Sequence, residues 1–157
     1  MFVKICGITT EDDALLAVGM GADALGFNFV PGSVRQVTPT AARDIVRRLP
    51  AGVMAVWVFR NELPKRVLEI VREAGLHAAQ LHGNERAEDS RLIGEQVQTL
   101  IKAFSAGDRT LDRLSEFGAD VVLVDSPEPG SGRVFDWSAL DGRERGIPLL
   151  LAGGLRP

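Results

Sequence analysis

The chain has 157 residues, enough for one domain with a sizeable core and too few for two comfortable domains. Hydrophobic residues make up 45% of the sequence and charged residues 25%, as in an ordinary globular protein. The net charge of -3 excludes recruitment of nucleic acid or an anionic membrane by bulk electrostatics. Any recognition of a phosphate group must therefore be local.

The number of cysteines and the first residues of the chain indicate the cellular compartment of the protein. A single cysteine, Cys6, excludes an intramolecular disulfide and is consistent with a reducing compartment. The opening MFVKICG lacks the basic segment and apolar run of a secretory signal. The longest apolar runs, such as Gly52–Phe59, are much shorter than the roughly 18 residues that suggest a membrane span. We therefore expect a cytoplasmic protein.

Short apolar runs recur along the chain and predict strands. They are Phe2–Cys6, Ala22–Phe29, Val53–Phe59, Ala78–His82, Thr99–Phe104, Val121–Asp125 and Pro148–Gly153. The runs are continuous rather than alternating, which favours strands that are covered on both faces, as in a parallel sheet. Their starts lie 20 to 31 positions apart, the length of one βα unit. This pattern fits one domain over residues 1–157, built either as a TIM barrel or as a doubly wound sheet.

Helix-start signals lie between these runs. They are Thr9 or Thr10 before an acidic first turn, Thr38 before Pro39, Asn61 before Glu62–Glu73, and Asp108 before a helix that ends near Gly118.

Cys6 closes the first predicted strand. In a barrel, an inward-facing side chain at the carboxyl end of a strand projects into the mouth where active sites lie. A lone cysteine is usually an inert buried thiol. Its place at a strand end, beside a helix N-terminus, favours a functional role instead.

Asp125 closes the sixth predicted strand after four apolar residues, and it is either a cap for the next loop or a placed acid. Alternation puts Asp125 on the face of Val121 and Leu123. It puts Cys6 on the face of Lys4. If both faces look inward, a thiol and a carboxyl meet across the mouth, and this pairing suits proton abstraction at one atom and proton donation at another.

Two glycine-rich stretches are candidates for phosphate binding. Gly130 and Gly132 follow the sixth strand, in a loop that is either a phosphate nest or a flexible turn. Gly153 and Gly154 directly follow the seventh strand and should precede a helix N-terminus. The loops after strands seven and eight often hold phosphate in barrels, so the second stretch is the stronger candidate.

Three polar residues are further candidates for the site. Arg35, in the loop after the second strand, is either a solvated surface arginine or a fork for a carboxylate or phosphate. Gln80 and His82 share one face of the fourth strand, where they either line a pocket or form a hydrogen-bonded pair in the barrel core. Motifs for metal or nucleotide binding are absent from the sequence, so it indicates neither a metal nor a nucleotide cofactor.

These motifs, in this order, resemble those of the phosphoribosylanthranilate isomerase family of tryptophan biosynthesis. The matching segments are VKICGIT (Val3–Thr9), GADALGFNF (Gly21–Phe29), Ser33-x-Arg35, QLHG (Gln80–Gly83), VDS (Val124–Ser126), GSG followed by FDW (Phe135–Trp137), and LAGGL (Leu151–Leu155). The resemblance implies a TIM (β/α)8 barrel, of which about seven βα units are present in this chain.

The resemblance also implies an activity and roles for single residues. The family converts N-(5'-phosphoribosyl)anthranilate into 1-(2-carboxyphenylamino)-1-deoxyribulose 5-phosphate by an Amadori rearrangement, without a cofactor. By position, Cys6 matches the general base at the sugar C2 and Asp125 the general acid at the furanose ring oxygen. Arg35 matches the residue that pairs with the anthranilate carboxylate. Gly153-Gly154 matches half of the phosphate site, and His82 a position that lines the pocket.

The sequence departs from the family pattern in three ways. It has Ser-Val-Arg at 33–35 where many relatives have Ser-Pro-Arg, and Arg60 where a smaller apolar residue is frequent. It also ends at Pro157, where the seventh helix should begin. Eight units at the observed spacing need about 200 residues, so we expect the natural protein to be longer and the first and seventh strands to be unpaired edges here.

Other functions remain as alternatives. The sister isomerases of histidine biosynthesis use two aspartates, so Cys6 argues against them, although an enzyme that acts on both substrates is conceivable. The second alternative is a non-catalytic fragment. The expected partner is a small phosphorylated substrate, with no nucleic acid and no membrane, and the sequence leaves the oligomeric state open.

Overall fold

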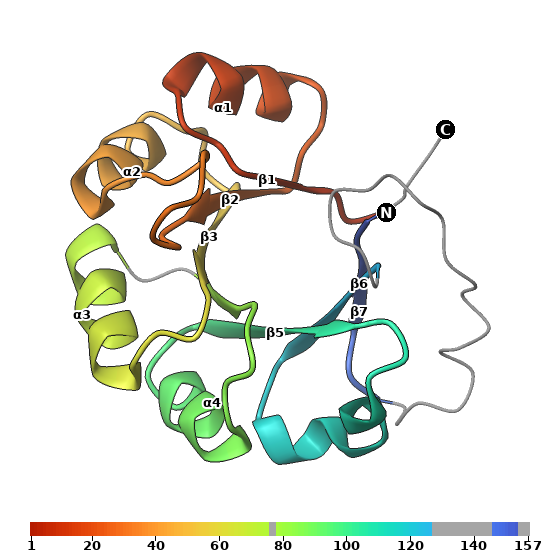
Figure 1. Ribbon diagram of the computed structural model, residues 1–157. Coiled ribbons are helices and arrows are strands. Elements are labelled where there is room, and N and C mark those ends of the chain that lie inside the picture. The colour runs from red at the N-terminus through yellow and green to blue at the C-terminus, as the bar shows by residue number, and fades with distance from the viewer. Residues whose placement is uncertain (76–77, 127–145, 154–157) are drawn as a thin grey trace.

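A single parallel sheet forms the centre of the computed structural model, which describes residues 1–75, 78–126 and 146–153. Its strands are β1 (Lys4–Cys6), β2 (Ala24–Asn28), β3 (Met54–Phe59), β4 (Ala78–Leu81), β5 (Thr99–Ser105), β6 (Val121–Asp125) and β7 (Leu149–Leu151). The sheet curls into most of a barrel, with the helices on its outer side (Figure 1).

The strand order distinguishes the two architectures that the spacing left open. Each strand pairs with the next one along the chain, from β1 to β7, and every pairing is parallel. A doubly wound sheet reverses its strand order at a switch point, and this sheet does not. The prediction of a TIM barrel with about seven βα units is confirmed.

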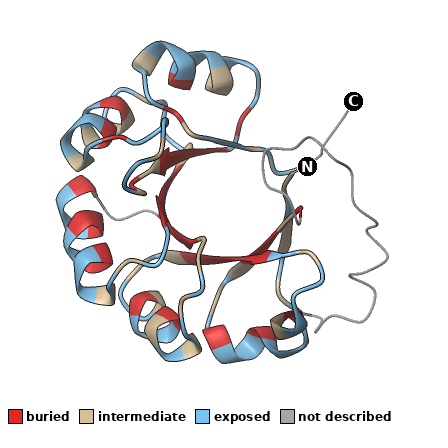
Figure 2. Cartoon of the chain, in the orientation of Figure 1, coloured by how far each residue is buried: buried red, intermediate tan, exposed pale blue. Residues whose placement is uncertain are grey.

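The central strands, β2 to β6, are largely apolar because both of their faces are buried (Figure 2). One set of side chains packs against the helices and includes Leu25, Phe27 and Trp57. The other set lies on the inner face of the curl and consists of Ala24, Val56, Val58, Ala78, Ile101, Ala103 and Leu123. Successive side chains of a strand point to opposite faces, so the two sets fix which residues look into the barrel.

The helices are α1 (Glu11–Gly19), α2 (Pro39–Val46), α3 (Pro64–Ala74), α4 (Ala87–Gly94) and the 3-10 helix η1 (Arg109–Phe117). Thr10, Thr38 and Asp108 each accept a hydrogen bond from a backbone N–H of the first turn, as the capping pattern predicts. Within the described residues, no helix is long and apolar enough to cross a membrane.

Asn61 does not cap a helix, and that prediction is wrong. Helix α3 begins at Pro64, whose fixed φ suits the first turn. Asn61 instead adopts a φ of 53°. Its Oδ1 accepts a hydrogen bond from the Asn84 backbone N–H at 2.7 Å, and its own N–H donates to Glu85 Oε1 at 2.8 Å. It therefore joins the loop after β3 to the loop after β4.

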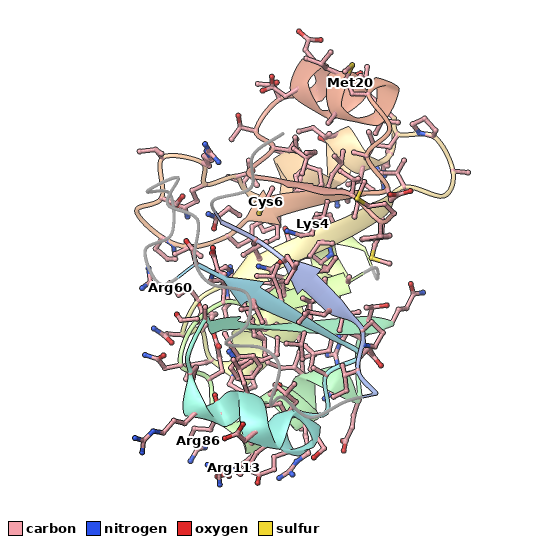
Figure 3. The ribbon with its side chains drawn as sticks, turned by 90° about the vertical axis from the view of Figure 1, so that its right-hand side faces the viewer. Lys4, Cys6, Met20, Arg60, Arg86 and Arg113 are labelled. Atoms are coloured by element: carbon pink, nitrogen blue, oxygen red, sulfur yellow. The ribbon has the colours of Figure 1, made fainter. Side chains whose placement is uncertain are left out.

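Strands β1 and β7 form the two edges of the described sheet. Ile5 and Leu151 are each 42% exposed, whereas the central strands are buried. Exposed apolar side chains also gather on and around β1 and α1, and Met20 stands at the end of α1 in Figure 3. The eighth βα unit that the spacing predicts stays a prediction.

Candidate active site

The candidate residues lie at the carboxyl ends of the strands. Cys6 is the last residue of β1, Asp125 is the last of β6, and His82 follows β4 directly. Because the strands are parallel, these ends meet at one rim of the barrel, where TIM-barrel enzymes place their active sites.

The thiol and the carboxyl both face the inside of the barrel, which is the condition under which they meet across the mouth. Lys4 pairs with Ala24, one of the side chains on the inner face of the sheet, so Lys4 also points inward. Cys6 lies two positions later in the strand and has the same orientation. Asp125 follows Leu123 of the inner face in the same way. Cys6 and Asp125 therefore share one face and one end of the sheet.

Gly26 makes room for the Cys6 thiol. Cys6 pairs with Gly26 on β2. A methyl group at Gly26 would lie 2.7 Å from Cys6 Sγ and 3.2 Å from Lys4 Nζ. Figure 3 shows Lys4 and Cys6 on the same strand. The glycine thus leaves the space that the thiol and the neighbouring ammonium occupy.

Gly26→Ala is expected to lower the free energy of unfolding by about 1–3 kcal/mol, the usual cost of overpacking. The added methyl would meet Cys6 Sγ at 2.7 Å and Cys6 Cα at 3.2 Å, and the Cα can move only with its strand. Gly19→Ala in α1 is the control, because a methyl there meets nothing within 4 Å. Denaturant unfolding measures both variants, and equal stabilities would show that the thiol does not need this space.

Arg35 lies across Gly7, the residue after the thiol. A methyl group at Gly7 would lie 2.5 Å from Arg35 Cδ, and Gly7 has a φ of +88° that favours glycine. Arg35 is exposed, and it lines an open hollow of about 670 Å³ together with Cys6 and Thr9. Within the described residues the Arg35 guanidinium makes no ion pair, and it is exposed at the same hollow as Cys6, where it can bind an anion.

Asp125 lies in a chain of polar contacts with His82 and Gln80. His82 Nε2 lies 3.3 Å from Asp125 Oδ2, and Gln80 Nε2 lies 2.8 Å from His82 Nδ1. Asp125 Oδ1 accepts a hydrogen bond from the Ser126 backbone N–H at 2.8 Å. The two side chains form the hydrogen-bonded pair, and His82 also lines a hollow of about 380 Å³ with Asp125. Gln80 is buried and does not line this hollow.

The backbone at Gly153, just after β7, packs closely against Asp125. A methyl group at Gly153 would lie 2.5 Å from Asp125 Oδ1, and its φ is +74°. The other three candidate glycines, Gly130, Gly132 and Gly154, lie outside the described residues. Arg60, the unusual cation after β3, is exposed and lines the same hollow as His82, so its place is on the rim (Figure 3).

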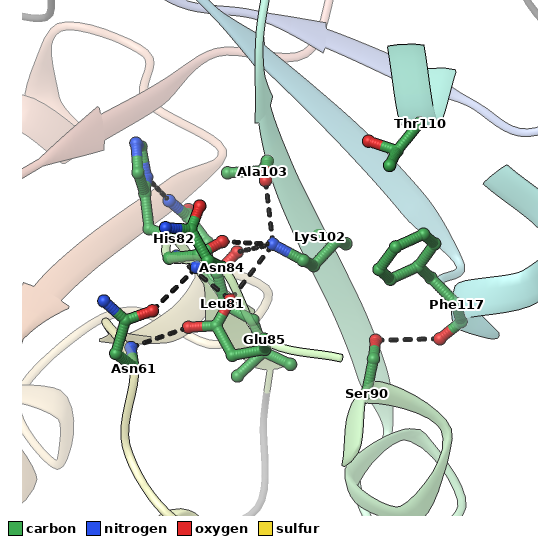
Figure 4. Close-up of polar contacts among 12 residues, drawn as sticks. Asn61, Leu81, His82, Asn84, Glu85, Ser90, Lys102, Ala103, Thr110 and Phe117 are labelled. Atoms are coloured by element: carbon green, nitrogen blue, oxygen red, sulfur yellow. Dashed lines mark hydrogen bonds and ion pairs between the residues drawn. The ribbon is translucent and has the colours of Figure 1, made fainter. Parts of the chain in front are cut away.

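A buried ion pair beneath this hollow was missed by sequence reasoning. Lys102 Nζ lies 3.0 Å from Glu85 Oε2, and the two side chains are 2% and 4% exposed. The ammonium also donates to the carbonyls of Gly83 at 2.8 Å and Ala103 at 2.9 Å (Figure 4). The available signal was a lysine in the middle of the apolar strand TLIKAFS, because a lysine is rarely buried unless it is paired.

Burial and pairing act in opposition on this pair. Burial lowers the pKa of Lys102, and the Glu85 carboxylate offsets part of that change. Burial would raise the pKa of Glu85, but the Lys102 charge and the hydrogen bonds from the Asn61 N–H and its own N–H outweigh it, so the pKa of Glu85 is lowered. The pair therefore favours a fixed carboxylate at the base of the hollow.

Comparison with known proteins identifies the relatives of this chain. The family described as N-(5'phosphoribosyl)anthranilate (PRA) isomerase matches residues 3–157. The N-(5'-phosphoribosyl)anthranilate isomerase of Desulforudis audaxviator is 46% identical over 162 residues, which cover 99% of this chain and 78% of that protein.

Solved structures give the same relationship. The crystal structure of phosphoribosyl anthranilate isomerase from Thermus thermophilus superposes with a TM-score of 0.86 at 41% identity, covering 99% of this chain and 78% of the other. A phosphoribosyl anthranilate isomerase in complex with reduced 1-(o-carboxyphenylamino)-1-deoxyribulose 5-phosphate superposes with a TM-score of 0.82 at 39% identity, covering 99% and 76%. The similarity thus includes both the sequence and the curled sheet.

Proposed function

Because the chain belongs to the family of N-(5'-phosphoribosyl)anthranilate isomerases, we propose that Cys6 and Asp125 are the base and the acid of its reaction. The enzyme is an isomerase of tryptophan biosynthesis and converts N-(5'-phosphoribosyl)anthranilate into 1-(2-carboxyphenylamino)-1-deoxyribulose 5-phosphate. The observation that carries the proposal is the shared inner face of Cys6 and Asp125 at the carboxyl end of the sheet.

Asp125 acts first, in its protonated form. It gives its proton to the furanose ring oxygen while the bond between that oxygen and C1 breaks, and the nitrogen lone pair forms the Schiff base at C1. The carboxylate that remains accepts the Ser126 N–H at 2.8 Å and lies 3.3 Å from His82 Nε2. Donors aimed at a developing charge lower the barrier for its formation.

Cys6 acts second, as a thiolate. It takes the proton from C2, and the electrons of that C–H bond form the C1=C2 double bond while the iminium becomes a neutral amine. The resulting enol at C2 becomes the ketone by transfer of its hydroxyl proton and protonation of C1. A positioned base and acid each contribute about 10²–10⁴-fold to such a reaction.

The substrate has two anionic ends, and the site has candidates for both. Arg35 supplies a planar fork beside Cys6 for the anthranilate carboxylate. Gly153 and Gly154 supply backbone N–H groups for the phosphate. The cytoplasm is the proposed compartment, because a thiol base must remain reduced.

Cys6→Ser is expected to lower kcat by about 10²-fold or more, because a hydroxyl is a far weaker base than a thiolate. The fluorescence of the anthranilate group follows the consumption of the substrate by this chain. Thr40→Ser, at an exposed position of α2, is the matched control and should keep the parent kcat. Parent-like kcat in Cys6→Ser would remove the thiol from the mechanism, and a parent chain without turnover would favour the non-catalytic alternative.

A further inference from the structure

Gln80 is a buried polar residue that the proposed mechanism does not use. It lies in β4, on the inner face of the sheet, and is 1% exposed. Its neighbours in register are Val58 on β3 and Ile101 on β5, both apolar. A buried amide among apolar side chains carries an energetic cost that its hydrogen bonds must offset.

The contact that Gln80 makes constrains the protonation of His82. Gln80 Nε2 lies 2.8 Å from His82 Nδ1. An amide nitrogen can only donate, so Nδ1 of the neutral imidazole must carry the lone pair. The ring proton is then on His82 Nε2, the atom that lies 3.3 Å from Asp125 Oδ2.

The opposite orientation of the amide is less favourable. Gln80 Oε1 is buried and has no hydrogen-bond partner within the part of the chain that the structure describes. Rotation of the amide by 180° would put Oε1 at the imidazole and two N–H donors in that unpartnered position. Buried N–H groups without an acceptor are rarer than carbonyl oxygens without a donor. The site therefore selects Gln80 as the donor.

We propose that Gln80 is a positioning residue, which sets the tautomer of His82 so that its Nε2–H donates to Asp125. The proposal rests on the proposed role of Asp125 as the acid. With this tautomer, one carboxylate oxygen accepts from His82 and the other accepts from the Ser126 N–H. The amide of β4 thus favours the carboxylate that Asp125 becomes after it has given its proton to the substrate.

Other charged side chains line the hollow of His82 and Asp125, and a substitution at Gln80 leaves all of them in place. They are Arg60 after β3, Glu85 before α4, Lys102 of β5 and Asp108 before η1. Glu85 and Lys102 form an ion pair at 3.0 Å and largely cancel each other. A difference between the variants of Gln80 therefore reports on the amide.

The tautomer can be measured directly, because the sequence has two histidines, His77 and His82. His77→Gln leaves His82 as the single imidazole. In this background, long-range proton–nitrogen NMR correlations show which ring nitrogen carries the proton. With Gln80 in place, we expect the neutral ring to be protonated at Nε2. Protonation at Nδ1 would overturn the proposal.

Two substitutions of Gln80 complete the test. Gln80→Glu puts an acceptor at Nδ1, so the ring proton should move to Nδ1, and kcat should fall by about tenfold or more while KM changes little. Gln80→Met has a similar size without a donor, and should give a mixture of tautomers and an intermediate kcat. It also keeps the test open if the glutamate variant does not fold, which circular dichroism reveals.

The outcomes separate this inference from the proposed function. An unchanged tautomer in both variants would overturn the inference, and so would a changed tautomer with parent-like kcat. The NMR measurement needs no substrate, so it assigns the tautomer of His82 even if the parent chain shows no turnover. An absence of turnover would count against the proposed function alone.

Discussion

Asp125→Asn is expected to lower kcat by about 10²- to 10⁴-fold and to leave the fold intact. Asparagine has nearly the shape of the aspartic acid, and its oxygen can still accept the Ser126 N–H that Asp125 Oδ1 accepts at 2.8 Å. It has no acidic proton to give to the ring oxygen of the substrate. The fluorescence assay gives kcat and KM, and thermal unfolding verifies the fold.

The matched control for this variant is Asp112→Asn. Asp112 is an exposed carboxylate of η1 that does not line the hollow. The Asp112→Asn variant has the same change of charge as Asp125→Asn and should keep the parent kcat. If Asp125→Asn retained the parent kcat, the proton on the ring oxygen would have to come from another donor. His82 would then be the first group to test, because its Nε2 lies 3.3 Å from Asp125 Oδ2.

The strands were predictable because a strand that is buried on both faces has a continuous run of apolar residues. Val121–Asp125 was predicted to the residue, and the run Thr99–Phe104 is one residue shorter than the observed strand, which ends at Ser105. The other five runs are one to three residues longer than the strands. Loop side chains at the ends of a run are as apolar as those inside it, so hydrophobicity alone does not mark where pairing stops.

The orientation of the candidate residues was also predictable, since alternation in a strand is a matter of backbone geometry. It put Asp125 on the face of Leu123 and Cys6 on the face of Lys4, and the structure shows that both of these faces look inward. Sequence reasoning could not find the surroundings of those residues, because contacts between strands join positions far apart in the chain. Gly26 beside Cys6 is 20 positions away, and Gly153 beside Asp125 is 28 positions away.

Helix α4 and the role of Asn61 were missed for related reasons. Helix α4 begins without a side-chain cap, so its start has only the acidic first turn of Glu88 and Asp89 as a signal. Asn61 has the residue type of a cap, but its Oδ1 bonds to the Asn84 N–H on the next loop. A tertiary partner thus overrides a local preference, and only the folded arrangement of the two loops reveals it.

The two hollows divide the site. One is lined by Cys6 and Arg35, and the other is lined by His82 and Asp125. The proposed base and the proposed carboxylate anchor line the first hollow, whereas the proposed acid and His82 line the second.

Lys102→Met is expected to lower the free energy of unfolding by about 3–5 kcal/mol, the usual result of removing one partner of a buried ion pair. Methionine fills the space of the lysine stem, so the loss comes from the Glu85 carboxylate, which stays buried without its cation, and from two carbonyls that lose their donor. Chemical denaturation measures the difference. Arg66→Met is the control, because its pair with Glu69 at 3.3 Å is exposed and such pairs contribute at most about 1 kcal/mol.

The pH dependence of the free energy of unfolding tests why Lys102→Met lowers the stability. In the parent, the pKa of Glu85 is lowered, so its contribution to stability is present above the unfolded pKa of about 4.3 and is lost as the pH falls through the folded value. Without Lys102, only backbone hydrogen bonds oppose the effect of burial, so we expect the folded pKa of Glu85 to be higher in the variant than in the parent. The difference in stability between Lys102→Met and the parent should therefore shrink as the pH falls from 8 toward about 4. A difference that stays constant over this range would mean that lost packing, and not the unpaired Glu85 carboxylate, destabilises the variant.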